Sequence, residues 1–284
     1  MKVLLTGASG QLGRQLQRAA RTHTVVALDH GALEIANLAQ VRAAIQAYRP
    51  DVVINAAAYN LVDQAETDRD AAFAVNALGP RNLALAAAAH RAAIVHVSSD
   101  YVFNGRKGVP YHEFDTPDPL SVYGQSKLAG ERAVQQANAR SYVVRTAWVY
   151  EPSGHGFAHT MCRLAATQRE VRVVDDQFGS PTAAEDLATG ILQLIESQAY
   201  GTYHLAGGGA PASWCEFAAE LFKAMQLDCV AVPVSSQEFA RPAARPAYAA
   251  LVSLQDPRIQ LPDWRDGVAR FARARRSVSG SAVS

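Results

Sequence analysis

Three polar residues in the first half of the chain have the types and the order needed for proton transfer at a carbonyl. Tyr123 and Lys127 lie four positions apart in a segment, 122–137, that is predicted to be helical, so both side chains project from one face. A lysine ammonium beside a phenol favours the phenolate, which makes the tyrosine a usable proton donor near neutral pH. Ser99 closes a predicted strand, 93–98, and its hydroxyl could donate to the same ketone oxygen. We interpret Ser99, Tyr123 and Lys127 as catalytic residues for hydride transfer at a carbonyl, with Lys127 also able to bond a nicotinamide ribose.

A glycine-rich loop precedes these residues. Gly7, Gly10 and Gly13 form a G-x-x-G-x-x-G pattern between a predicted strand, 3–6, and a predicted helix, 11–20. Glycines at this spacing let the backbone approach a pyrophosphate, and the N-terminus of the following helix favours its negative charge. The pattern therefore predicts a dinucleotide-binding loop.

The choice between two nicotinamide cofactors depends on an acidic residue. Asp29 follows a predicted strand, 24–28, and lies nineteen positions after Gly10. A carboxylate there can accept hydrogen bonds from the adenosine ribose hydroxyls and would repel a 2′-phosphate, which favours NADH. Arg14 and His30 lie close enough in sequence to offset this charge. NADPH and NADH therefore both stay open as the cofactor.

The elements that position these residues alternate between strand and helix. This order predicts an α/β fold, a Rossmann-like doubly wound parallel sheet with right-handed crossovers and a smaller C-terminal substrate lobe. We expect a dinucleotide-binding domain over 1–147, with 184–206 returning to it, and a substrate-binding lobe over most of 148–284, the last few residues being a flexible tail. Besides those named above, the expected strands are 51–55, 142–146 and 203–205, and the expected helices are 38–48, 68–90, 184–196 and 214–225.

Composition excludes several classes of partner. The formal net charge of +1 gives no general reason to expect a nucleic acid or a membrane surface. The apolar start Met1–Leu5 is too short for a signal peptide or a membrane span. Cys162, Cys215 and Cys229 are odd in number and have no metal-ligand spacing, which favours reduced thiols and a cytoplasmic location.

Several longer segments narrow the interpretation. From Met1 to about Arg270 the chain resembles the dTDP-4-dehydrorhamnose reductase family of the extended short-chain dehydrogenase/reductases. The resemblance implies NAD(P)H-dependent reduction of the 4-keto group of dTDP-4-dehydro-6-deoxy-L-mannose to dTDP-L-rhamnose. The segments that carry it are Asn55-Ala-Ala-Ala-Tyr59, Val62-Asp63, Ser99-Asp-Tyr-Val-Phe103, Tyr123-Gly-Gln-Ser-Lys-Leu-Ala-Gly-Glu131, Arg145-Thr-Ala-Trp-Val-Tyr150, Asp176-Gln-Phe-Gly-Ser-Pro-Thr182 and Arg245-Pro246.

The resemblance also implies which residues contact each ligand. Four of these residues have an alternative role: Val97, Ile35 and Trp148 could be packing residues, and Asp100 could cap a loop. The residues implied to contact the sugar are Ser99, Asp100, Tyr123 and Trp148. Those expected on the dinucleotide are Gly7, Gly10, Gln11, Leu12, Gly13, Asp29, Glu34, Ile35, Ala58, Tyr59, Asn60, Val97, Tyr123 and Lys127.

Departures from the family pattern leave alternatives open. Leu61 is bulkier than the usual alanine, and Ala249 and Val252 replace a hydroxyl and a carboxylate. A 4-ketoreductase or epimerase acting on another NDP-deoxysugar therefore stays open, as does a non-catalytic, dinucleotide-binding regulatory subunit. Some relatives dimerise through carboxylates around a metal. Glu185 matches one such carboxylate but Gln15 replaces another, so we expect no structural metal and a monomer or weak homodimer.

Overall fold

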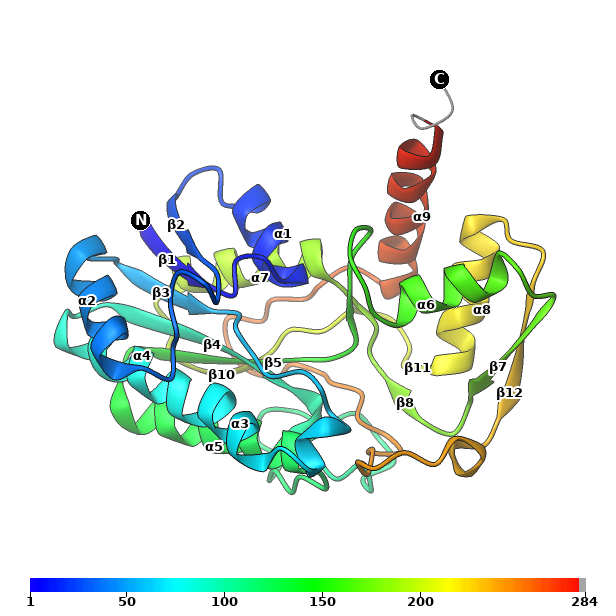
Figure 1. Ribbon diagram of the computed structural model, residues 1–284, viewed down its shortest axis with the longest axis horizontal. Helices are drawn as coiled ribbons and strands as arrows, with labels where there is room; N and C mark the ends of the chain where they lie inside the picture. The colour runs from blue at the N-terminus through cyan, green and yellow to red at the C-terminus, as the bar shows by residue number, and fades with distance from the viewer. Residues whose placement is uncertain (281–284) are drawn as a thin grey trace.

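The centre of the molecule is a six-stranded sheet in which every neighbouring pair of strands is parallel (Figure 1). The computed structural model describes residues 1–280, with side chains described through residue 277. The strand order is β10-β5-β4-β3-β1-β2, so the chain reverses direction across the sheet between β1 and β3. This order confirms the predicted Rossmann-like α/β fold. The strands are β1 (Lys2–Thr6), β2 (Thr24–Leu28), β3 (Val52–Asn55), β4 (Ala93–Ser99), β5 (Ser141–Thr146) and β10 (Gly201–His204).

Helices cover both faces of the sheet because its strands are apolar on both sides. Successive side chains of a strand point to opposite faces. Val3 and Leu5 therefore join one core cluster with helices α1 and α7, and Leu4 joins another with α2, α4 and α5. The bounds are α1 (Gln11–Ala19), α2 (Leu38–Tyr48), α4 (Gly79–Ala89), α5 (Val122–Ala137) and α7 (Ala184–Ser197).

The predicted helix over 68–90 is interrupted by a wider turn. It consists of α3 (Arg69–Phe73), the π-helical segment η2 (Ala74–Leu78) and α4. Asn76, inside η2, is fully buried, and its backbone oxygen faces α5 so closely that a Cβ on Gly130 would lie 2.1 Å from it. A π-turn is a common way to redirect a buried side chain at a functional site. Here it turns the Asn76 amide toward the end of β3.

The substrate lobe is built from short strand pairs and three helices packed around an aromatic core. β6 pairs with β9, β7 with β12 and β8 with β11, each as a separate two-stranded sheet. Figure 1 shows this lobe beside the main sheet, with the C-terminal end of α9 projecting from the lobe. The bounds are β6 (Val149–Tyr150), α6 (Phe157–Ala165), β7 (Glu170–Val174), β8 (Phe178–Gly179), β9 (Thr182–Ala183), β11 (Ala212–Ser213), α8 (Trp214–Met225), β12 (Val230–Val234) and α9 (Trp264–Gly280).

The chain leaves the sheet and returns to it. After β9 it forms α7, which packs on α1, and then β10, which pairs with β5 at the edge of the sheet. The exact division into domains at residue 147 stays a prediction. Of the predicted flexible tail, residues 277–280 belong to α9 and residues 281–284 lie outside the described part of the chain. Within residues 1–280, no helix has the length and apolar character needed to cross a membrane.

Candidate active site

The glycine loop packs too tightly for any side chain at two of its positions. Gly7 has a φ of +72°, and a Cβ on it would lie 2.5 Å from the backbone nitrogen of Ala57. A Cβ on Gly13 would lie 2.2 Å from the Gly7 oxygen. α1 begins directly after Gly10, which has no side chain to cap the first N–H groups of the helix. Uncapped donors at a helix N-terminus suit a pyrophosphate, so the loop fits a dinucleotide.

The two residues after Gly10 differ in what they can offer such a ligand. Gln11 is half-buried and its Oε1 has no hydrogen-bond partner among the described residues. The Leu12 side chain belongs to the core cluster between α1, α7 and the sheet. Contact of Leu12 with a dinucleotide would therefore have to come from its backbone.

The end of β2 presents carboxylates. Asp29 is exposed, and its Oδ1 accepts a hydrogen bond from the Ala32 nitrogen at 3.0 Å. Glu34 Oε2 lies 3.5 Å from His30 Nδ1, four residues earlier in the chain. Arg14, considered from the sequence as an offset to Asp29, instead pairs with Glu151 across the loop after β6. The Arg14 guanidinium therefore pairs with Glu151 and does not offset the charge of Asp29.

Ile35 is placed in the core. Its side chain is buried with those of α2 and α4, and it fills the space beside Gly79. The packing role left open from the sequence therefore accounts for this side chain.

The loop after β3 is held by Asn76, a residue to which the sequence analysis assigned no role. The Tyr59 nitrogen donates to Asn76 Oδ1 at 2.8 Å, and Asn76 Nδ2 donates to the Tyr59 oxygen and to Ser126 Oγ, both at 3.0 Å. These bonds fix the segment Ala58–Asn60 against α5. An asparagine within the alanine-rich segment predicted to be helical was the only sequence signal for this anchor.

Ser99, Asp100 and Tyr123 meet at the carboxyl end of β4. Ser99 Oγ donates to Asp100 Oδ1 at 2.8 Å. The Ser99 side chain also lies close enough to the Tyr123 hydroxyl to act on its pKa, in the lowering direction. The Tyr123 hydroxyl donates to Asn60 Oδ1 at 3.4 Å. Asp100 Oδ2 is buried without a partner among the described residues. Burial raises the pKa of Asp100 to about 7, so this carboxyl titrates near neutral pH.

Lys127 is bonded to the backbone of β4, and its action on Tyr123 stays a prediction. Its Nζ donates to the Val97 oxygen at 2.6 Å, and burial lowers the pKa of Lys127 to about 8. The pKa of Tyr123 is raised, not lowered: burial is the main cause and the Asp100 carboxyl adds to it. The phenol is therefore held protonated, because both effects disfavour a second negative charge at this position.

A buried ion pair lies one helical turn beyond Lys127. Glu131 accepts two hydrogen bonds from Arg145, at 3.0 and 2.7 Å, and a third from Ser98. Both charged side chains are almost fully buried. Glu131 and Arg145 belong to two of the segments that carry the family resemblance, but nothing in the sequence indicated that they pair. Together they join α5 to β4 and β5.

A hollow opens between Asp100 and the lobe. Asp63, before η1 (Gln64–Glu66), accepts two hydrogen bonds from Arg245 at 2.9 Å, and these lower the Asp63 pKa to about 2. This pair links the cofactor side of the site to the lobe. Ala249, one of the departures from the family pattern, lies in the wall of the hollow. Its lining residues are Asp100, Tyr101, Trp148, Gln177, Phe178, Trp214, Arg245, Pro246 and Ala249.

Comparisons with known proteins agree with this geometry. The family model described as RmlD substrate binding domain matches residues 1–277. A dTDP-4-dehydrorhamnose reductase of Mycolicibacterium smegmatis is 43% identical over 276 residues, 94% of this chain and 84% of the relative. The chain belongs to the dTDP-4-dehydrorhamnose reductase family.

Two other similar proteins have names or structures that specify a ligand. The crystal structure of the Bacillus anthracis dTDP-4-dehydrorhamnose reductase in complex with NADP superposes with a TM-score of 0.93 at 41% identity, covering 96% of this chain and 99% of that one. A probable dTDP-4,6-dihydroxy-2-methyloxan-3-one 4-ketoreductase of Streptomyces antibioticus is 42% identical over 88% of this chain and 86% of its own.

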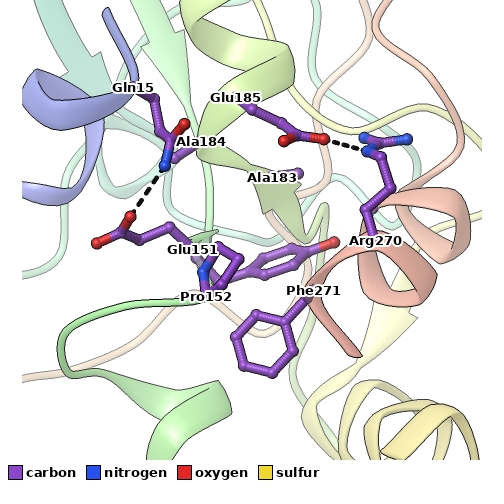
Figure 2. Close-up of a pocket in the computed structure, with 10 residues that line it drawn as sticks. Gln15, Glu151, Pro152, Ala183, Ala184, Glu185, Arg270 and Phe271 are labelled. Atoms are coloured by element: carbon purple, nitrogen blue, oxygen red, sulfur yellow. Dashed lines mark hydrogen bonds and ion pairs between the residues drawn. The ribbon is translucent and has the colours of Figure 1, made fainter. Parts of the chain in front are cut away.

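A second pocket has none of Ser99, Tyr123 and Lys127 in its lining. It is formed where α1, the start of α7 and α9 meet, and Figure 2 shows Gln15 bonded to Glu151 and Glu185 paired with Arg270. Among residues 1–280 there is no group of three or more histidine, cysteine or acidic side chains placed to hold a metal ion. The expectation of no structural metal stays a prediction.

Proposed function

We propose that this protein is an NAD(P)H-dependent oxidoreductase that reduces the 4-keto group of dTDP-4-dehydro-6-deoxy-L-mannose, giving dTDP-L-rhamnose. The observation that carries the proposal is the meeting of Ser99, Asp100 and Tyr123 at the carboxyl edge of the sheet. Ligands of doubly wound folds bind at this edge. Relatives that carry the reductase name over most of their length support the choice of substrate.

The dinucleotide site follows from the glycine loop. When bound, a reduced nicotinamide dinucleotide supplies the hydride. Gly7, Gly10 and Gly13 would let the backbone approach its pyrophosphate, and the first N–H groups of α1 would bond the phosphate oxygens. The Asp29 carboxylate supports NADH, whereas the NADP complex of the Bacillus anthracis relative supports NADPH. We propose that either serves, with NADH favoured by Asp29.

Tyr123 is the proton donor in this mechanism. Burial and Asp100 keep its phenol protonated, so the proton is present when the ketone oxygen gains charge. Ser99 lies beside it and can share the same oxygen once its bond to Asp100 is given up. Preorganised donors aimed at a developing oxyanion in a buried site are a large source of rate acceleration. Lys127 lies on α5 and is bonded to the Val97 oxygen of β4, and from there its ammonium would bond the nicotinamide ribose.

We also propose a substrate site, an oligomeric state and a cellular location for the protein. The substrate is a dTDP-deoxyhexose held in the hollow between Asp100 and Arg245. We infer a monomer or weak homodimer in the cytoplasm, supported by three cysteines that are all free thiols.

The direct test is a steady-state assay of the purified protein with dTDP-6-deoxy-L-lyxo-4-hexulose and either NADH or NADPH. We expect oxidation of the cofactor with equimolar formation of dTDP-L-rhamnose, identified by NMR. Cofactor binding without turnover of this sugar would contradict the proposed substrate.

A reductase acting on another NDP-deoxysugar is the second candidate. Ala249 lines the hollow where the family pattern places a hydroxyl, and a relative of similar identity is named as a ketoreductase of a different dTDP-sugar. A panel of dTDP-4-keto sugars, each assayed with both cofactors, separates the two. A kcat/KM higher for a different sugar would favour this candidate.

A further inference from the structure

Trp148 is held in a backbone conformation that few side chains adopt. Its φ is +47°, the left-handed region, in the short connection between β5 and β6. Bulky residues occupy this region only when the surrounding structure imposes it. The Trp148 oxygen accepts a hydrogen bond from the Thr182 nitrogen at 3.2 Å. One backbone bond does not fix the direction of an indole, so other contacts must do so.

Two neighbours enclose the Trp148 indole. The ring of Trp214 stacks on it with centroids 3.4 Å apart and planes 6° from parallel. Gly179 backs against its Nε1 side so closely that a Cβ there would lie 2.5 to 2.7 Å from three indole atoms. The φ of Gly179 is not in the left-handed region, so glycine is required at this position by space alone.

Both neighbours come from one small piece of sheet. Gly179 ends β8 and pairs with Ala212 of β11, and Trp214 follows β11 as the first residue of α8. Ser213 and Glu216 form a capping box at that helix start, and Phe157 packs on Trp214 with centroids 4.5 Å apart. Contacts within the lobe therefore hold Trp214 independently of its stack on Trp148.

The stacked pair faces the substrate hollow. Trp148 and Trp214 line it together with Asp100, Tyr101 and Arg245. Neither indole forms a hydrogen bond with Ser99 or Tyr123, and their surfaces are apolar. An apolar wall contacts the ketone and the transition state alike, so it contributes to substrate affinity more than to the chemical step.

We propose that Trp214 is a positioning residue, which through its stack fixes the Trp148 indole as the apolar wall of the sugar-nucleotide site. This inference rests on the proposed function for its kinetic part. The stack itself is independent of any substrate. A purely structural role for Trp214 predicts loss of stability without a selective change in substrate affinity.

The test uses Trp214→Ala, Trp214→Phe and Gly179→Ala. In Trp214→Ala we expect KM for the keto sugar to rise by about tenfold or more while kcat and the dinucleotide Kd stay within about threefold, the pattern of lost uniform binding. Trp214→Phe keeps an aromatic face and should restore KM to near the wild-type value. Gly179→Ala changes neither tryptophan, but its new Cβ must displace the Trp148 indole. We therefore expect it to raise KM as well.

Circular dichroism provides a readout that does not depend on activity. Two stacked indoles in contact give an exciton couplet in the far ultraviolet when their transition dipoles are skewed relative to each other. We expect the couplet in the wild type, its loss in Trp214→Phe and Trp148→Phe, a reduced couplet in Gly179→Ala, and its retention in Trp264→Phe, since Trp264 lies in the lobe core apart from the stack. Gly179→Ala is informative even if Trp214→Ala does not fold.

Three results would overturn the inference. One is a far-ultraviolet circular dichroism spectrum that neither Trp214→Phe nor Trp148→Phe changes. Another is an unchanged KM in both Trp214→Ala and Gly179→Ala, and the third is an equal loss of kcat, cofactor binding and thermal stability in Trp214→Ala, Trp214→Phe and Gly179→Ala. A couplet present in a protein that turns over no keto sugar would instead refute the proposed function and leave the stack intact.

Discussion

The six-stranded sheet and the substrate lobe reach a similar degree of burial by different means. The sheet strands are four to seven residues long, and those near its centre are apolar on both faces. In the lobe, β6, β8, β9 and β11 have two residues each, and aromatic side chains fill the core. The sheet is specified by continuous local patterns, whereas the lobe is specified by contacts between residues far apart in the chain.

The two regions also place charge differently. In the sheet, Glu131 and Arg145 form an ion pair with less than a tenth of either side chain exposed. In the lobe, the pair between Arg172 and Glu238 has about half of each side chain in solvent. The ion pair that joins α5 to the sheet is thus buried, whereas this pair in the lobe is exposed to solvent.

The largest effect is expected at the catalytic edge of the sheet. Tyr123→Phe removes the proton donor but keeps the ring and its edge contact with Tyr101. Loss of a positioned general acid lowers turnover by about 10²–10⁴-fold. We expect kcat to fall by this amount, with the dinucleotide Kd, measured by fluorescence titration, unchanged. Turnover close to that of the wild type would disprove the role given to Tyr123.

The glycine loop gives the next effect. Gly13→Ala would place a Cβ 2.2 Å from the Gly7 oxygen, and backbone atoms cannot yield at low cost. Overpacking of this kind costs about 1–3 kcal/mol, or about ten- to a hundredfold in an equilibrium constant. We expect the loop to distort and the dinucleotide Kd to rise within this range in the same titration.

A matched control lies in the turn after β2. At Gly31 the nearest atom to a new Cβ is Asp29 Oδ1 at 3.5 Å, an ordinary contact. Gly31→Ala should therefore bind the dinucleotide as the wild type does. If Gly31→Ala and Gly13→Ala weaken binding equally, tight packing is not what makes Gly13 necessary.

The buried and the exposed ion pair should contribute differently to the free energy of unfolding. Glu131→Gln leaves Arg145 buried without its carboxylate, which costs about 3–5 kcal/mol for a buried pair. Glu238→Gln breaks an exposed pair and should cost about 0–1 kcal/mol. Urea unfolding of the two variants measures both free energies of unfolding. Similar losses in the two would mean that the regions do not differ in their electrostatics as described.

The smallest effect concerns the link between the two regions and depends on pH. The folded-state pKa of Asp63 is lowered from 3.8 to about 2 by Arg245, so the pair stabilises the fold above pH 3.8 and is lost as pH falls through about 2. The difference in Tm between wild type and Asp63→Asn should therefore narrow as pH falls across this window.

The pKa of Asp100 is shifted in the opposite direction to that of Asp63. Its folded-state pKa is raised from 3.8 to about 7, mainly by burial, so its ionisation destabilises the fold as pH rises between these values. The Tm of Asp100→Asn should therefore rise relative to the Tm of the wild type as pH increases over that range. A constant Tm difference for either variant would contradict the assigned cause.

The sheet and the glycine loop could be predicted because each is a local pattern. The strand 24–28 and the helices 38–48 and 122–137 have the predicted bounds, and Tyr123 and Lys127 lie on the predicted helix. The lobe strands β6, β8, β9 and β11 could not be predicted, since a two-residue strand has no periodicity. Asp63 and Arg245 were noted in separate motifs, but their pairing joins residues 182 positions apart and exists only in the fold.

The electrostatics of the site were also beyond the sequence. Four-residue spacing suggested that Lys127 would act on Tyr123, but the structure directs Lys127 to Val97 and encloses Tyr123 near Asp100. The shift in the Tyr123 pKa then follows from burial, which depends on what packs above the helix. Asn76 was hidden for a similar reason, since its role requires a π-turn that a helical pattern does not reveal.

The position of β10 has a consequence for biosynthesis. β5 is buried along its whole length and receives its outer neighbour only after α6, β7, β8, β9 and α7 have been translated. Until then a nascent chain carries an apolar strand with one open edge, the kind of surface that recruits other chains. A ribosome stalled anywhere in the first half of the lobe would thus hold an aggregation-prone intermediate, and chaperone demand should be greatest over that interval.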